Sequence, residues 1–157
     1  MTTVRVRIAA AVRSRSTGHP NYSVALPRTP EAVGEARFFA RVVLGTWHLT
    51  GPVVDDAVLL LSEMVTNAVV HGDGLRITIS IDRPAPGRVL LAVRDRAHER
   101  VPRRRSPGPG DTSGRGLHLL DALAIQWGCD RWGPPQKPVG KRVWAELDAQ
   151  PTTDRTS

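Results

Sequence analysis

The chain has little cysteine, few aromatic residues and no long apolar run. Cys129 is its single cysteine, which excludes an internal disulfide and a structural zinc site built on several thiolates. No stretch approaches the roughly 20 apolar residues of a membrane-spanning helix, so no membrane partner is expected. Cys129 follows a glycine in an apolar context and is predicted to be a small buried side chain rather than a nucleophile. These features favour a cytoplasmic protein.

The first 20 residues are rich in arginine and serine and contain no acid. Their only apolar stretch, IAAAV, is shorter than the roughly 7–15 residues of a signal-peptide core. A disordered basic tail is the simpler interpretation. A transit peptide is the alternative interpretation, because an arginine- and serine-rich segment without acids also fits that class.

The net charge of +7 is unevenly distributed along the chain. Residues 1–30 carry +5 and residues 94–105 carry +4, so the remaining residues sum to −2. The tail 1–20 and the loop 94–105 contain no Phe, Tyr or Trp that could stack on bases. Nucleic-acid binding is therefore not the expected function, although the basic tail and loop keep it as a third hypothesis.

Apolar periodicity and turn residues predict a series of helices and strands. We expect strands at 22–26, 75–82, 88–95, 125–132 and 141–147, helices at 31–45, 52–71 and 117–124, and a long loop at 96–113. Thr29 is expected to cap the first helix, and Gly72-Asp73-Gly74 to end the second, since glycine tolerates the left-handed cap conformation.

This order of elements predicts an α+β two-layer sandwich. Its mixed, mainly antiparallel sheet of about five strands would be covered on one face by about three helices. A chain of 157 residues has the length of one domain. The domain is expected to span 21–148, with disordered tails at 1–20 and 149–157.

A row of polar side chains lies on the predicted second helix, in the apolar stretch LLLSEMVTNAVVHG. Glu63, Asn67 and His71 follow one another at four-residue intervals on the shoulder of the apolar stripe. Taken singly, each has a structural interpretation. Glu63 would be an acid exposed to solvent, Asn67 a buried amide with its hydrogen bonds satisfied, and His71 a residue that interacts with the dipole near the helix end. Taken together, they could border a pocket between this helix and its neighbours.

A second group of residues lies further along the chain. Asp95 ends the strand RVLLAVRD, where the chain enters the long loop. That loop finishes in GPGDTSGRGL, whose Gly-Arg-Gly is expected to open a helix. Free backbone N–H groups at a helix start can bind an anion, although a flexible linker is the alternative. The chain contains neither a P-loop motif nor a dinucleotide-binding glycine motif.

The order of these motifs resembles the Bergerat-fold (GHKL) ATP-binding superfamily. The likeness is to the bacterial anti-sigma factor serine kinases of the histidine-kinase-like ATPase subgroup. SEMVTNAVVHG resembles the N-box, GRGLHLLDALAIQWG the second glycine box, and GKRVWAEL the final strand. The likeness extends over about residues 22–148.

The resemblance implies roles for the polar residues. Asn67 would bind the Mg²⁺ that bridges the ATP phosphates, which suits an amide oxygen. Glu63 would be the general base that takes a proton from a protein serine, and Asp95 would accept a hydrogen bond from the adenine amino group. The loop 96–113 would be the ATP lid. The other implied ATP-binding residues lie at the start of the last helix: Gly114, Arg115, Gly116 and Leu117.

Two residues depart from the family pattern on the adenine side. Ala97 stands where an Asp-x-Gly glycine is usual, and Arg142 stands where a Thr usually supports the adenine-binding Asp. The resemblance implies a serine/threonine protein kinase in transcription regulation, whose partners are a sigma factor, an anti-anti-sigma (STAS) protein or both. It leaves a homodimer open. A pseudokinase that sequesters a protein partner is the alternative, in case the departures abolish catalysis.

Overall fold

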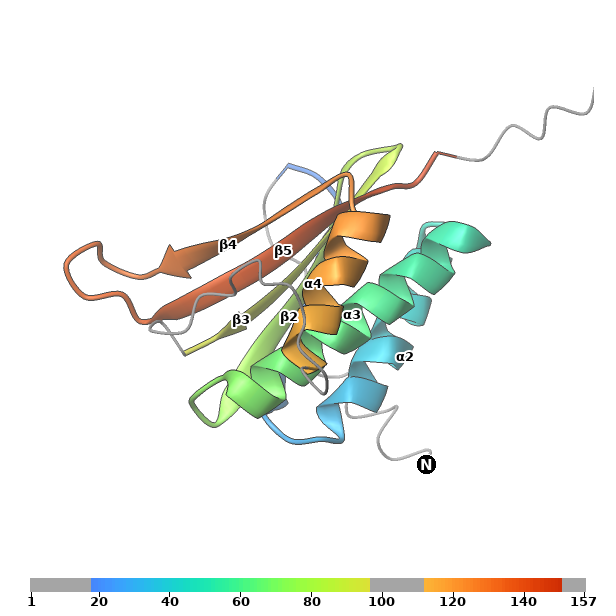
Figure 1. The fold of residues 1–157 in the computed structure, drawn as a ribbon. Helices are drawn as coiled ribbons and strands as arrows, with labels where there is room; N and C mark the ends of the chain where they lie inside the picture. The colour runs from blue at the N-terminus through green and yellow to red at the C-terminus, as the bar shows by residue number, and fades with distance from the viewer. Residues whose placement is uncertain (1–17, 97–111, 151–157) are drawn as a thin grey trace, which may run out of the picture.

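A five-stranded sheet forms one layer of the molecule and three helices form the other (Figure 1). The computed structural model describes residues 18–96 and 112–150, with side chains from 118 onward in the second range. The predicted tails and the predicted lid lie almost entirely outside these ranges. The elements are β1 (Asn21–Pro27), α2 (Ala32–Thr46), α3 (Pro52–His71), β2 (Arg76–Ala85), β3 (Arg88–Asp95), α4 (Thr112–Leu123), β4 (Gln126–Trp132) and β5 (Gly140–Asp148).

The strand order is β1-β2-β3-β5-β4, and every neighbouring pair is antiparallel. The order of the last two strands in the sheet is therefore the reverse of their order in the sequence, so that β5 and not β4 lies beside β3. The α+β two-layer prediction is confirmed, with three helices on one face (Figure 1). No parallel pair occurs among the described strands, although a mixed sheet was expected. Among the described residues, no helix is long and apolar enough to cross a membrane.

The core lies between the sheet and the helices because apolar residues alternate along the central strands. Ile77, Ile79 and Ile81 of β2 are fully buried, and they pair in register with residues of β1 and β3. The facing set of β3 is Val89, Leu91 and Val93. The last residue of β3, Asp95, is in phase with this set and therefore lies on the helix-covered face.

Helix α3 has the bounds that the sequence predicts, 52–71. Gly51 precedes it with φ +75°, a conformation that glycine adopts without strain, and Pro52 occupies its first turn. The helix ends before Gly72-Asp73-Gly74, as predicted. Gly72 itself is extended, with φ −79° and ψ 173°, and Gly74 is the residue with a positive φ, +86°.

Two other helix starts differ from the prediction. Helix α2 begins at Ala32, because residues 29–31 form a turn in which the carbonyl of Thr29 accepts from the N–H of Ala32 at 3.0 Å. The expected hydroxyl cap by Thr29 is thus replaced by Glu31 at the cap position, without a side-chain hydrogen bond. Helix α4 begins at Thr112, five residues before the predicted Leu117.

Candidate functional site

Asp95 is a buried carboxylate at the end of a central strand. It is 4% exposed on the helix-covered face of the sheet. Its backbone carbonyl accepts a hydrogen bond from Nε1 of Trp132, at 3.1 Å, which joins the end of β3 to the end of β4. A buried carboxylate is costly unless charge or hydrogen bonds compensate it, so its neighbours decide what it can do.

Lys141 is the charge beside Asp95. The two residues face each other in register on β3 and β5. Lys141 is 5% exposed, and its Nζ lies 3.9 Å from Oδ2 of Asp95. Lys141 was not among the residues predicted from the sequence.

The prediction that Arg142 stands beside the adenine-binding carboxylate is wrong by one residue. Arg142 pairs with Arg94, on the opposite face of the sheet, where its Nη1 lies 3.7 Å from Oδ2 of Asp130. The alternation along β5 could have shown this, because Val143 and the apolar residues after it at every second position face the helices. Lys141 is in phase with them, and Arg142 is not.

Gly72 brings the end of α3 against Asp95. A Cβ at Gly72 would overlap the carbonyl oxygen of Ala68 and would lie 3.1 Å from Cγ of Asp95. The absence of a side chain is therefore what allows the helix end to approach the carboxylate. This contact places the helix that carries Glu63 and Asn67 directly over the end of β3.

Arg28 fixes the same helix end and was not predicted as a site residue. Its Nη1 donates to the carbonyl of Val69 at 2.6 Å, and its Nε donates to the carbonyl of Gly74 at 2.7 Å. These carbonyls lie at or beyond the last turn of α3, where backbone acceptors lack helical partners. The arginine that follows β1 thereby attaches the end of α3 to the sheet.

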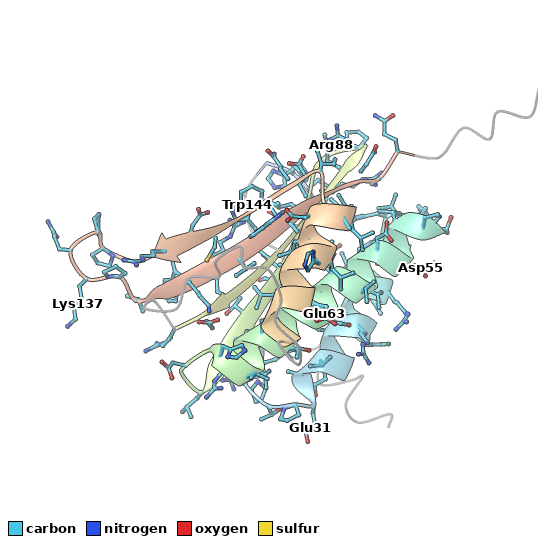
Figure 2. All side chains as sticks on the ribbon, viewed as in Figure 1. Glu31, Asp55, Glu63, Arg88, Lys137 and Trp144 are labelled. Carbon is cyan, nitrogen blue, oxygen red and sulfur yellow. The ribbon has the colours of Figure 1, made fainter. Side chains whose placement is uncertain are left out.

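The predicted polar row of α3 lies at the edge of its buried face. Glu63, Asn67 and His71 are all half-buried, whereas Met64 and Ala68 beside them are buried. Figure 2 shows Glu63 on the part of α3 that faces α4, and α3 and α4 pack against each other. Whether the row borders a pocket stays a prediction, as do the individual roles of the three residues.

The other neighbour of α3 is α2, which is held by a different polar contact. Nε of Arg37 donates to Oγ of Ser62 at 2.8 Å. Ser62 is only 5% exposed, so this bond lies within the α2–α3 contact.

The glycine-rich segment is helical in this structure rather than a loop before a helix. Because α4 begins at Thr112, Gly114 is in the first turn, where backbone N–H groups have no helical acceptor. The N–H of Gly116 lies past that turn and is directed to a helical carbonyl. Phosphate binding by the N–H groups of Gly114 and Gly116 stays a prediction. Ala97 and the side chains of Arg115 and Leu117 lie outside the described residues.

Cys129 is half-buried on β4, and its thiol is held in the protonated form. Burial raises the pKa of this thiol above its ordinary value. The positive charge of Lys141 opposes the rise, and the negative charges of Asp130 and Asp95 add to it. A thiol with a raised pKa is a poor nucleophile at neutral pH, which agrees with the predicted small, inert side chain.

A magnesium ion would need few protein ligands here. Over 18–96 and 112–150, no three His, Cys, Asp or Glu side chains are grouped as a metal site. Mg²⁺ keeps several waters and is often bound through one or two protein groups plus substrate phosphates. The half-buried amide of Asn67 fits that kind of site, because it can supply one oxygen ligand.

A cavity of about 530 Å³ lies at the other end of the sheet. Trp47, His48, Arg83 and Asp148 are among the residues that line it. Asp148 pairs with Arg88 at the start of β3, the end of this strand opposite Asp95. This cavity contains none of the predicted site residues.

The site has a buried carboxylate at the end of a central strand, under the end of the helix that carries Glu63 and Asn67. This arrangement is expected of a GHKL-type ATP-binding domain. The chain matches the family model of the histidine kinase-like ATPase domain over residues 26–144. It belongs to this family and is an ATP-binding protein of the GHKL type. No curated protein matches the chain.

Proposed function

We propose that the chain is an ATP-dependent serine/threonine protein kinase of the anti-sigma factor type. It would bind a sigma factor and phosphorylate a serine of an anti-anti-sigma (STAS) protein. The observation that carries this proposal is the placement of Glu63 and Asn67. They are half-buried, one helical turn apart, on the helix whose end contacts Asp95 through Gly72.

Each of these side chains has a distinct part in the proposed reaction. The carboxylate of Asp95 would accept a hydrogen bond from the adenine amino group, and Asn67 would supply an oxygen ligand to Mg²⁺, which would neutralise phosphate charge. The bond from the serine oxygen to the γ-phosphorus forms while the bond from that phosphorus to the β-phosphate oxygen breaks. Glu63 accepts the serine proton. Phosphoryl transfer of this kind depends mainly on positioning and charge neutralisation.

The kinase proposal is tested by separating transfer from binding. In Glu63→Gln the side chain keeps its size and loses its basicity. Transfer of labelled phosphate from ATP to a STAS protein should fall by about 10²–10⁴-fold, the usual contribution of a general base, while ATP affinity is retained. Asp55→Asn is the matched control, because Asp55 is an exposed acid in the first turn of the same helix (Figure 2). Transfer that is equal in Glu63→Gln and Asp55→Asn would remove Glu63 from the role of base.

A non-catalytic interaction module that sequesters a protein partner is the second candidate. The Lys141–Asp95 ion pair favours it, because a cation at the base-binding carboxylate could occupy the place of the nucleotide base. This candidate predicts that the wild-type protein binds its partner equally well with and without ATP. A partner affinity that depends on ATP and Mg²⁺ would contradict it.

A further inference from the structure

The cavity at the end of the sheet opposite Asp95 has both polar and apolar walls. Its volume of about 530 Å³ is within the range of about 300–1,000 Å³ that is usual for binding pockets. The walls come from the segment between α2 and α3, the start of α3, the β2–β3 turn and the end of β5. Trp47, Leu49 and Val53 are among its apolar residues. The cavity therefore lies apart from the site proposed for ATP.

The charged residues that line the cavity are mainly acidic. Asp56 and Asp148 are acids, and Arg83 is the one fixed cation among the described residues that line it. The guanidinium group of Arg83 is bonded to backbone carbonyls. Its Nη2 donates to Pro86 at 3.0 Å, and its Nη1 donates to Trp47 at 3.4 Å. Arg83 thus joins the β2–β3 turn to the end of α2, and holds two walls of the cavity together.

Asp56 is the acid that a ligand of this cavity could pair with. Its half-buried carboxylate makes no hydrogen bond or ion pair with any residue that the structure describes. Asp148, in contrast, is exposed, and its Oδ1 lies 3.3 Å from Nη1 of Arg88. Water screens a half-buried charge less than an exposed one, so Asp56 should attract a cation more strongly. A guanidinium group fits best, because it can also stack on the ring of Trp47.

A basic segment of the same chain joins the fold beside this cavity. Residues 1–17 lie outside the described residues, and their sequence contains four arginines and no acid. The chain then leads into β1, where the carbonyl of Pro20 accepts from the N–H of Arg83 at 2.8 Å. The described chain thus begins two residues before a direct contact with a cavity-lining residue. Arg13 and Arg15 precede Pro20 by seven and five residues, which span at most about 17–25 Å when extended.

We propose that the cavity binds an arginine side chain from the N-terminal segment 1–17 of the same chain. In this arrangement the guanidinium group pairs with Asp56 and stacks on Trp47. Because the segment is covalently attached, its effective concentration at the cavity is on the order of millimolar, so that even a weak contact is occupied. The inference concerns the end of the sheet away from Asp95, and it depends neither on nucleotide binding nor on phosphate transfer.

The experiment measures how the full chain binds a fluorescently labelled peptide with the sequence of residues 1–17, by fluorescence anisotropy. In the wild type, the attached segment competes with the added peptide. A four-glutamine variant removes this competition and should bind the peptide about 10-fold more tightly than the wild type does. Added salt should weaken the binding, because it screens the charges. The variant replaces these residues by glutamine: Arg5, Arg7, Arg13 and Arg15.

Two adjacent acids of α3 provide matched changes, each made in the four-glutamine variant. Asp56→Asn keeps the size of the side chain, removes the charge from the cavity and should weaken peptide binding by about 5–10-fold. Asp55→Asn removes the same charge from an exposed residue that is not part of the cavity lining. It should change the affinity by less than about 2-fold.

Two outcomes would overturn the inference. Equal peptide affinity in the wild type and the four-glutamine variant would show that the attached segment does not occupy the cavity. If that binding were still lost in Asp56→Asn, the cavity would be assigned to a basic segment of another protein instead. Equal weakening by Asp56→Asn and Asp55→Asn would indicate attraction to an acidic surface rather than to this cavity. The first comparison changes no described residue, so it tests the inference even if Asp56→Asn does not fold.

Discussion

Gly72→Ala tests whether the end of α3 depends on a position without a side chain. The added Cβ would overlap the carbonyl oxygen of Ala68 and lie 3.1 Å from Cγ of Asp95. The helix backbone cannot rotate away as a flexible side chain could, so either the last turn of α3 or the end of β3 must move. Both segments carry residues of the candidate site.

The cost should lie at or above the top of the range for overpacking, about 3 kcal/mol in the free energy of unfolding. For a chain of this size, that corresponds to a fall in Tm of about 6–12 °C. Urea titration followed by tryptophan fluorescence would measure the change in free energy, and calorimetry would measure Tm. Because Asp95 is displaced, ATP affinity should fall too, even under conditions where the variant is fully folded.

Gly34→Ala is the matched control. A Cβ at Gly34, within α2, would meet nothing within 4 Å. This change should stabilise the protein by about 0.5–1 kcal/mol, because alanine is the better helix former. If Gly72→Ala were as stable as the wild type, the argued close packing of Gly72 against the carbonyl of Ala68 and against Asp95 would be refuted. Equal destabilisation by both changes would refute it also.

Two further predictions concern residues beside the site. Arg28→Ala removes the donors to the carbonyls of Val69 and Gly74 and should lower the free energy of unfolding by about 1–3 kcal/mol, measured by urea titration. Arg41→Ala, an exposed arginine of α2, should change it by less than about 0.5 kcal/mol, and equal effects would contradict the proposed attachment. Burial raises the pKa of Cys129, so alkylation of the folded protein should reach its half-maximal rate at a higher pH than alkylation of the urea-unfolded chain. Because the thiol of the unfolded chain ionises at a lower pH, the free energy of unfolding should be constant below the ordinary thiol pKa and should fall as the pH rises above it. Equal alkylation midpoints for the folded protein and the unfolded chain would contradict the burial of Cys129.

Local signals in the sequence were sufficient where they marked both ends of an element. The bounds of α3 were predicted correctly because Gly51-Pro52 begins the helix and Gly72 interrupts it. Strand β3 was predicted correctly as well, since it lies between the turn at Pro86-Gly87 and Asp95. The order of helices and strands then followed, and with it the fold class.

Long-range contacts explain the errors. A Cβ at Gly72 would overlap the carbonyl oxygen of Ala68 and would also lie 3.1 Å from Cγ of Asp95, which is 23 positions further along the chain; no local pattern contains the second contact. Arg142 of β5 was predicted on the wrong face of the sheet. The alternation of Val143 with its neighbours indicates that Lys141, and not Arg142, lies on the same face as Asp95. Helix α4 extends through a serine- and glycine-rich segment that local propensity assigns to a loop. Glu63 and Asn67 were found because their spacing is a local property of one helix.

The close packing around Asp95 has a consequence for how the chain tolerates substitution. Gly140 resembles Gly72, because a Cβ at Gly140 would overlap the backbone carbonyl of Asp95 and lie 2.6 Å from Nε1 of Trp132. Neither glycine has a side chain that could contact a nucleotide, yet each limits the position of the Asp95 carboxylate. In a library of random single variants, positions 72 and 140 should therefore accept fewer residue types than position 63, whose half-buried side chain has room for replacements that preserve folding. Variants that abolish folding and variants that abolish only chemistry would then fall at different positions of the same site.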